Sequence, residues 1–257
     1  MKNSLLVIAA CLATSVGTSA QTRVVGNKDF ITKNVDVNAD FTAIQVKGSP
    51  DVYYTQTSGE VSIEIYGASN IIPYVETIVK DGTLIVKYKS NIIINNSGKL
   101  EVRVSAPNVT AMRVSGSGDI FIEKGISTNR DLNFEVHGSG DIHGKKLKSN
   151  NLYVHVHGSG DIDFSSVDCS RVEANVHGSG DIALKGKARD AYYRVNGSGD
   201  ISASNMAVNN VEARINGSGD ISCYAIDKLT GNVRGSGDVG YKGNPDVDFP
   251  RKGLYKL

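Results

Sequence analysis

The second half of the chain carries seven copies of one pentapeptide, Gly-Ser-Gly-Asp followed by Ile or Val. Successive copies are 22, 20, 20, 19, 20 and 18 residues apart, and their aspartates are Asp119, Asp141, Asp161, Asp181, Asp200, Asp220 and Asp238. A period near twenty residues without a helical pattern is typical of a solenoid built from β-strands. The repeat therefore predicts an all-β protein, a parallel β-helix with about 20 residues per coil.

Aligning the copies on aspartate gives three apolar columns, which predict three short strands per coil. Before the glycines, apolar residues such as Val154 and Val156 alternate with outward polar ones such as His155. A second column begins with the Ile or Val after aspartate. A third, about six residues past aspartate, consists of Ile126, Leu147, Val167, Met206 and Ile226. Each strand should pair in parallel with its equivalent one coil away, so that like stacks on like.

The glycines mark the turn between two strands of a narrow tube, which needs positive φ or a close backbone approach. Fourteen of the 28 glycines are predicted to have this structural role: Gly116, Gly118, Gly138, Gly140, Gly158, Gly160, Gly178, Gly180, Gly197, Gly199, Gly217, Gly219, Gly235 and Gly237. Replacing Gly160 or Gly180 by Val should therefore lower the melting temperature much more than Ser159→Ala.

Residues 1–20 have the layout of a cleaved secretory signal, with Lys2, an apolar stretch and small residues before Gln21. A lipoprotein-like box ends at Cys11, but cleavage there would leave too short a signal, so lipid anchoring is not expected. We expect export to the periplasm, the cell surface or the medium.

The rest of the chain divides by its periodicity. Residues 21–110 predict strands without the tight repeat, with Gly48-Ser49-Pro50-Asp51 as an imperfect first turn and Asp81-Gly82 as a hairpin turn. This region should cap one end of the coils of residues 111–242 and hide their edge strands. The tail, residues 243–257, breaks the repeat and is expected at the other end.

Charge and cysteine content limit the partners. Without Lys2 the 28 basic residues become 27, which balance the 27 acidic ones, so no basic surface for nucleic acid is expected. No segment after the signal is long and apolar enough to cross a membrane. Cys169 and Cys223 fall about three coils apart, beyond disulfide reach, which predicts two free, buried thiols.

Four segments in order resemble the GIN-domain family, a domain of unknown function described as the head of auto-transporter adhesins. They are Asp40-Phe41-Thr42-Ala43-Ile44-Gln45-Val46-Lys47-Gly48, Asp81-Gly82-Thr83-Leu84-Ile85-Val86, Ala106-Pro107-Asn108, and Val114-Ser115-Gly116-Ser117-Gly118-Asp119-Ile120. The resemblance runs over nearly the whole mature chain. It implies an exported protein of Gram-negative bacteria, a right-handed β-helix and no established catalytic activity.

The aspartate column allows three interpretations. The favoured one is structural: each carboxylate accepts backbone N–H groups of its own turn. Calcium is an alternative for Asp141, Asp161 and Asp181, but calcium-binding β-rolls use a nine-residue repeat with two turns per coil. Stacked carboxylates also approach the spacing of retaining glycosidases, yet a uniform ladder lacks two different environments. An enzyme site would have to lie near residues 50 to 110.

Histidines and tyrosines supply the other candidates. His137, His157 and His177 precede the glycines in three successive coils, where adjacent imidazoles could chelate a transition metal. Because the same column continues as Asn196, Asn216 and Arg234, a solvated polar ladder is favoured, and no metal or other cofactor is expected. The candidates for ligand contacts on this outward face are Tyr153, His155, His157 and Tyr192.

The sequence thus favours an exported, non-catalytic β-helix that presents a long polar face to a protein or glycan at the cell envelope, or to another copy of itself. The alternatives are a carbohydrate-active β-helix enzyme and a calcium-stabilised structural module.

Overall fold

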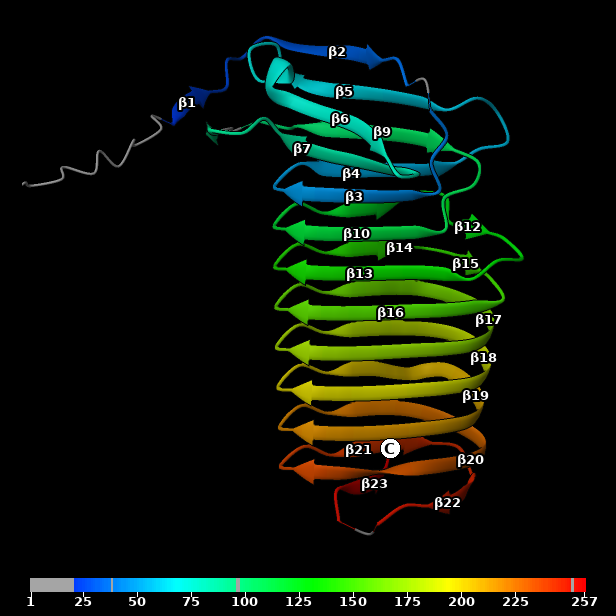
Figure 1. Ribbon diagram of the computed structural model, residues 1–257. Helices are drawn as coiled ribbons and strands as arrows, with labels where there is room; N and C mark the ends of the chain where they lie inside the picture. Colours follow the sequence, from blue (N-terminus) through cyan, green and yellow to red (C-terminus); the bar gives the residue numbers. More distant parts are fainter. Residues whose placement is uncertain (1–20, 38, 96–97, 251) are drawn as a thin grey trace, which may run out of the picture.

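The computed structural model describes residues 21–257, apart from residues 38, 96–97 and 251. The chain forms a right-handed parallel β-solenoid, topped by a more irregular group of N-terminal strands (Figure 1). The predicted fold class is confirmed. The predicted signal peptide, with Cys11, lies outside the described residues.

Strands account for almost all of the regular structure. They are β1 (Thr22–Val25), β2 (Phe30–Val35), β3 (Ala43–Gly48), β4 (Asp51–Gln56), β5 (Ser62–Ala68), β6 (Val75–Lys80), β7 (Thr83–Tyr88), β8 (Ile92–Asn95), β9 (Glu101–Ala106), β10 (Ala111–Gly116), β11 (Ile120–Ile122), β12 (Ile126–Ser127), β13 (Leu132–Gly138), β14 (Ile142–Gly144), β15 (Leu147–Lys148), β16 (Asn151–Gly158), β17 (Ile162–Gly178), β18 (Ile182–Gly197), β19 (Ile201–Gly217), β20 (Ile221–Gly235), β21 (Val239–Lys242), β22 (Asp246–Asp248) and β23 (Leu254–Lys256). One short 3-10 helix, η1 (Ile72–Tyr74), precedes β6.

Equivalent residues of successive coils lie side by side, as the repeat requires. Val114 of β10 pairs with Val136 of β13, which pairs with Val156 of β16, always in parallel. The stack begins before the first complete motif, because Gly48 of β3 pairs with Gly116. From β17 to β20 the separate strands of a coil merge into one strand that continues around the corner. Each of these four strands is 15 to 17 residues long.

The core is the dry interior of the tube. The residues after the repeat aspartates, from Ile120 to Val239, are all at most 1% exposed. Ile226 is the exception to the predicted columns: it is 42% exposed, so its assignment to the interior is wrong. The final interval is the shortest, and the register of β19 and β20 slips after Ala203. The slip puts Ala225, fully buried, in the inward position instead.

The two glycine columns meet different constraints. The first glycine of each motif has φ between +134° and +152°, a region that residues with a Cβ rarely adopt. The second glycine does not have positive φ, but its position leaves no room for a side chain. At Gly160, for instance, a Cβ would lie 2.1 Å from the carbonyl oxygen of Gly140, one coil away.

The two ends of the stack are paired differently. At the N-terminal end β9 pairs in parallel with β4 and antiparallel with β5, whose other edge pairs with β2. The hairpin of β6 and β7 turns at Asp81 and Gly82, both with positive φ, as predicted. At the C-terminal end β22 and β23 add parallel strands to β20 and β21. No helix among the described residues is long and apolar enough to cross a membrane.

Candidate functional site

One flat side of the solenoid, which we call the polar face, carries three outward columns across eight successive rungs. Rung by rung they are Ala43, Gln45, Lys47; Ala111, Arg113, Ser115; Asn133, Glu135, His137; Tyr153, His155, His157; Glu173, Asn175, His177; Tyr192, Arg194, Asn196; Glu212, Arg214, Asn216; and Thr230, Asn232, Arg234. The inward neighbours stay apolar throughout, whereas the outward chemistry changes from rung to rung. The polar face is therefore a differentiated surface.

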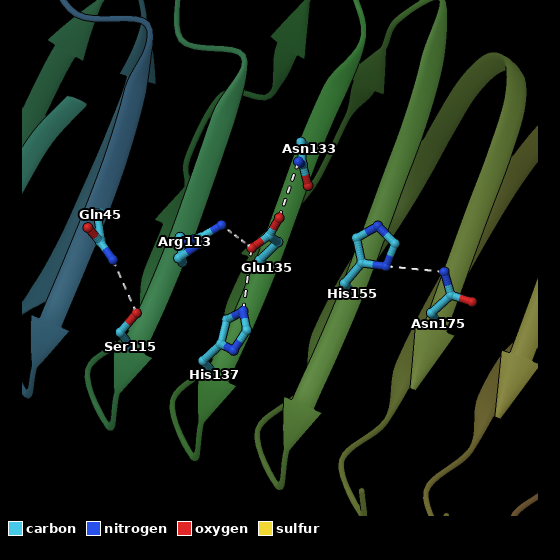
Figure 2. Close-up of polar contacts among 8 residues, drawn as sticks. All are labelled: Gln45, Arg113, Ser115, Asn133, Glu135, His137, His155 and Asn175. Carbon is cyan, nitrogen blue, oxygen red and sulfur yellow. Dashed lines mark hydrogen bonds and ion pairs between the residues drawn. The ribbon is translucent and has the colours of Figure 1, made fainter. Parts of the chain in front are cut away.

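Glu135 organises the first half of the polar face (Figure 2). Its carboxylate forms an ion pair with Arg113 on the preceding rung, accepts a hydrogen bond from Asn133 at 3.3 Å, and lies 3.4 Å from His137 Nε2. Burial alone would raise the pKa of Glu135, but Arg113 and the hydrogen bonds outweigh it and lower the pKa. This carboxylate is thus held ionised.

The predicted histidine column is a stack of rings. The centroids of His137 and His157 are 4.7 Å apart, and those of His157 and His177 are 5.0 Å apart. Burial, followed by the neighbouring imidazoles, lowers the pKa of His157. Within the part of the chain that the structure describes, no group of three or more His, Cys, Asp or Glu side chains is arranged to hold a metal ion.

The other three ligand candidates lie one column or two away from the stack. His155 Nδ1 is 3.1 Å from the side-chain nitrogen of Asn175, and burial lowers the pKa of His155 (Figure 2). Tyr153 and Tyr192 share a column, but Glu173 separates them. The guanidinium of Arg171 lies over the Tyr192 ring, 4.1 Å from its centroid, so this tyrosine already has a cationic partner.

The aspartate column joins one coil to the next. Each carboxylate from Asp51 to Asp220 accepts the backbone N–H of the next aspartate in the column at 2.7–3.0 Å, and the series ends at the N–H of Asp238. The expectation that each carboxylate bonds within its own turn is therefore wrong. In a parallel stack the nearest free donor belongs to the neighbouring rung. Asp141, Asp161 and Asp181, named above as calcium candidates, all take part in this ladder.

A second side of the tube carries an aromatic column that the sequence analysis missed. The rings of Tyr53 and Phe121 are 4.9 Å apart and those of Phe121 and His143 are 5.4 Å apart. They border a hollow of about 370 Å³ that Glu123 and Lys145 also line. Each ring stands two residues after the aspartate of its turn, so alignment of Asp51 with the repeats would have revealed the column.

The region expected to hold any enzyme site contains one pair of neighbouring carboxylates. Asp51 of β4 lies opposite Glu101 of β9, and burial raises the pKa of Asp51. Glu101 is only 7% exposed and is held by Arg103 at 2.6 Å and Lys99 at 3.4 Å. Asp51 in turn accepts the N–H of Asp119. Both carboxylates are thus engaged by protein donors.

Cys169 and Cys223 are free and buried, as expected. Burial raises the pKa of both thiols to about 12. Neither thiol is therefore a nucleophile at neutral pH.

Comparison with known proteins supports the resemblance proposed from the sequence. The family model described as "Putative auto-transporter adhesin, head GIN domain" matches residues 40–245. A crystal structure from Parabacteroides distasonis ATCC 8503, described as a "Putative lipid binding protein", has a TM-score of 0.85 and 26% identity, and the match covers 92% of this chain and 100% of that chain.

Two further crystal structures are each described as a "putative adhesin". One, from Parabacteroides merdae ATCC 43184, has a TM-score of 0.83 and 25% identity, over 91% of this chain and 96% of that chain. The other, from Bacteroides fragilis NCTC 9343, has a TM-score of 0.65 and 30% identity, over 91% of this chain and 95% of that chain. A comparison with curated proteins gave no match.

Proposed function

Because the chain belongs to the "Putative auto-transporter adhesin, head GIN domain" family, we propose that it is an exported, non-catalytic binding module. In this proposal the polar face engages a protein or glycan partner at the cell envelope. The mature chain begins at Gln21, after removal of residues 1–20, and binds by area along its flat side.

The observation that carries the proposal is the contrast between inward and outward columns. Structural needs repeat from coil to coil, and the buried column and the aspartate ladder repeat accordingly. The polar face instead changes from the Glu135 network through the histidines to the arginines of β18–β20. A stack that needed only solubility would not require this variation, whereas recognition of a partner would.

Capture experiments with the mature chain, residues 21–257, test the proposal. The chain is immobilised and offered a glycan array and envelope proteins. A double variant, Tyr153→Ser and His157→Asn, alters the centre of the polar face. A matched control, Asp163→Asn and Ser165→Ala, alters exposed positions on the side of the aromatic column. We expect a captured partner to be lost with the first variant and kept with the control. Capture that is unchanged in the first variant and also unchanged when the outward arginines Arg194, Arg214 and Arg234 of the polar face are replaced, or no capture at all, contradicts the proposal.

The alternatives have separate readouts. Turnover of any glycan by the mature chain, abolished by Glu101→Gln, would favour the carbohydrate-active enzyme. A calcium-dependent rise in melting temperature that disappears in Asp161→Asn would favour the calcium-stabilised module. We expect neither response, because these carboxylates already accept protein hydrogen bonds.

A further inference from the structure

The C-terminal rungs of the polar face carry a cluster made entirely of hydrogen-bond donors and amides. Arg194, Arg214 and Arg234, with Asn196, Asn216 and Asn232, surround a hollow of about 220 Å³, which we call the arginine trough. The only other residue that lines it is Ile215, whose side chain is buried in the core. Two further hollows adjoin it, one sharing Arg194 and Arg214 and the other Arg214 and Arg234. Carboxylates also line these two hollows (Glu173 and Glu212 in one, Glu212 and Asp248 in the other), so the lining free of carboxylates is that of the trough itself.

Positive charge in the trough is only partly compensated. Arg194 and Arg214 are direct neighbours on adjacent rungs, where like charges repel. Arg214 pairs with Glu212 at 2.6 Å, but neither Arg194 nor Arg234 makes an ion pair with any described residue. All three arginines are exposed. Two arginines elsewhere are paired: Arg113 on the polar face has Glu135 as its carboxylate partner, and Arg171, two residues before Glu173 on β17, has Glu173.

We propose that the arginine trough binds the acidic groups of a linear polysaccharide that lies along the solenoid axis. Guanidinium groups bind carboxylates and sulfates through paired N–H donors, and the asparagine amides can bond to sugar hydroxyls. Donors recur on successive rungs about 4.8 Å apart, so a chain with repeated anionic groups meets them in turn. The trough has no apolar cavity for an acyl chain, which favours a polysaccharide over a lipid. This inference rests on the proposed function and names the ligand class for one end of the polar face.

Binding of polygalacturonate to the mature chain, measured by calorimetry, tests the inference. Its fully methyl-esterified form keeps the sugars and removes the charge, and dextran sulfate and uncharged dextran provide the same comparison for sulfate. The triple variant Arg194→Gln, Arg214→Gln and Arg234→Gln should bind polygalacturonate at least about tenfold more weakly. Arg189→Gln removes one exposed arginine outside the trough and should bind as the wild type does. Affinity should fall as salt is raised.

Several results would overturn the inference. They are equal binding of the acidic and esterified polymers, unchanged binding by the triple variant, or binding to phosphatidylglycerol vesicles in preference to polygalacturonate. The three arginines are exposed, so the triple variant should fold as the wild type does. Unchanged circular dichroism and melting temperature will verify this. If a neutral glycan or a protein binds through the Tyr153 and His157 region while the triple variant is unaffected, this inference fails and the proposed function stands. If nothing is captured at all, both fail.

Discussion

At the scale of single residues, the repeated motif acts mainly on the neighbouring coil. The glycines clear space for the backbone of the coil before, and the aspartates bond to the N–H of the coil after. The serine between the two glycines is exposed at Ser159 and its equivalents, and its backbone N–H bonds to the previous coil whatever the side chain. The serine of a motif should therefore tolerate substitution, whereas the glycines on either side of it should not.

Gly160→Val tests this difference. The new Cβ would stand 2.1 Å from the Gly140 carbonyl oxygen, so two stacked turns would have to separate. We expect a loss of about 3 kcal/mol or more in the free energy of unfolding, against at most about 0.5 kcal/mol for Ser159→Ala. Chemical denaturation followed by circular dichroism measures both. Similar small losses in the two variants would contradict this account of the turn.

The aspartate ladder shows what a repeat reveals about a residue and what it hides. The spacing alone places every copy at the same point of the turn. Choosing between a donor in the same turn and one in the next coil depends on where Asp141 Oδ1 lies relative to Asp161 N, 2.7 Å away. That relation depends on the stacking geometry of two coils, which no local pattern in the sequence contains.

At the scale of strands, hydrophobic columns predict the interior well wherever successive coils have equal length. Ile226 was misplaced because the last coil loses residues at its corner, and spacing counted from aspartate no longer applies beyond that corner. The aromatic column was missed because Tyr53 belongs to a turn whose sequence departs from the repeat. The arginine trough draws on two neighbouring outward columns, so neither column alone indicated it.

The histidine column should make the stack sensitive to acid. The pKa of His157 in the folded chain lies below its free value of about 6.5, so folding favours the neutral ring. Its contribution to stability is complete above that free value and is lost as the pH falls below it, through the lower folded-state pKa. The fall in melting temperature between about pH 7.5 and about pH 5 should therefore be smaller in His157→Asn than in the wild type.

A control in the same column separates protonation from packing. Asn216→Ser changes a side chain two rungs beyond His177 and removes no titratable group, so it should keep the acid response of the wild type. An acid response in His157→Asn equal to that of the wild type would show that burial and the neighbouring rings do not disfavour protonation of His157.

At the scale of the whole molecule, the stack is close to one-dimensional. Almost every interaction joins a coil to the one before or after it, through parallel pairing, apolar columns and the aspartate ladder. Stability should then be close to a sum of coil and interface contributions. Each end of the stack is covered by its own paired strands, so the number of coils between the two ends can change without exposing either end.

Deleting one complete coil, residues 162–181, tests this additivity. The deletion joins Asp161 to Ile182, so the motif stays in phase, and Val156 would meet Val195 in the core. We expect a folded chain with a single unfolding transition, a lower free energy of unfolding and a smaller dependence on denaturant, because less surface is buried. Removing residues 162–171 instead leaves half a coil, which puts apolar residues outside the tube and should prevent folding. If the half-coil deletion folded as well as the full one, the register of the coils would not be what holds the molecule together.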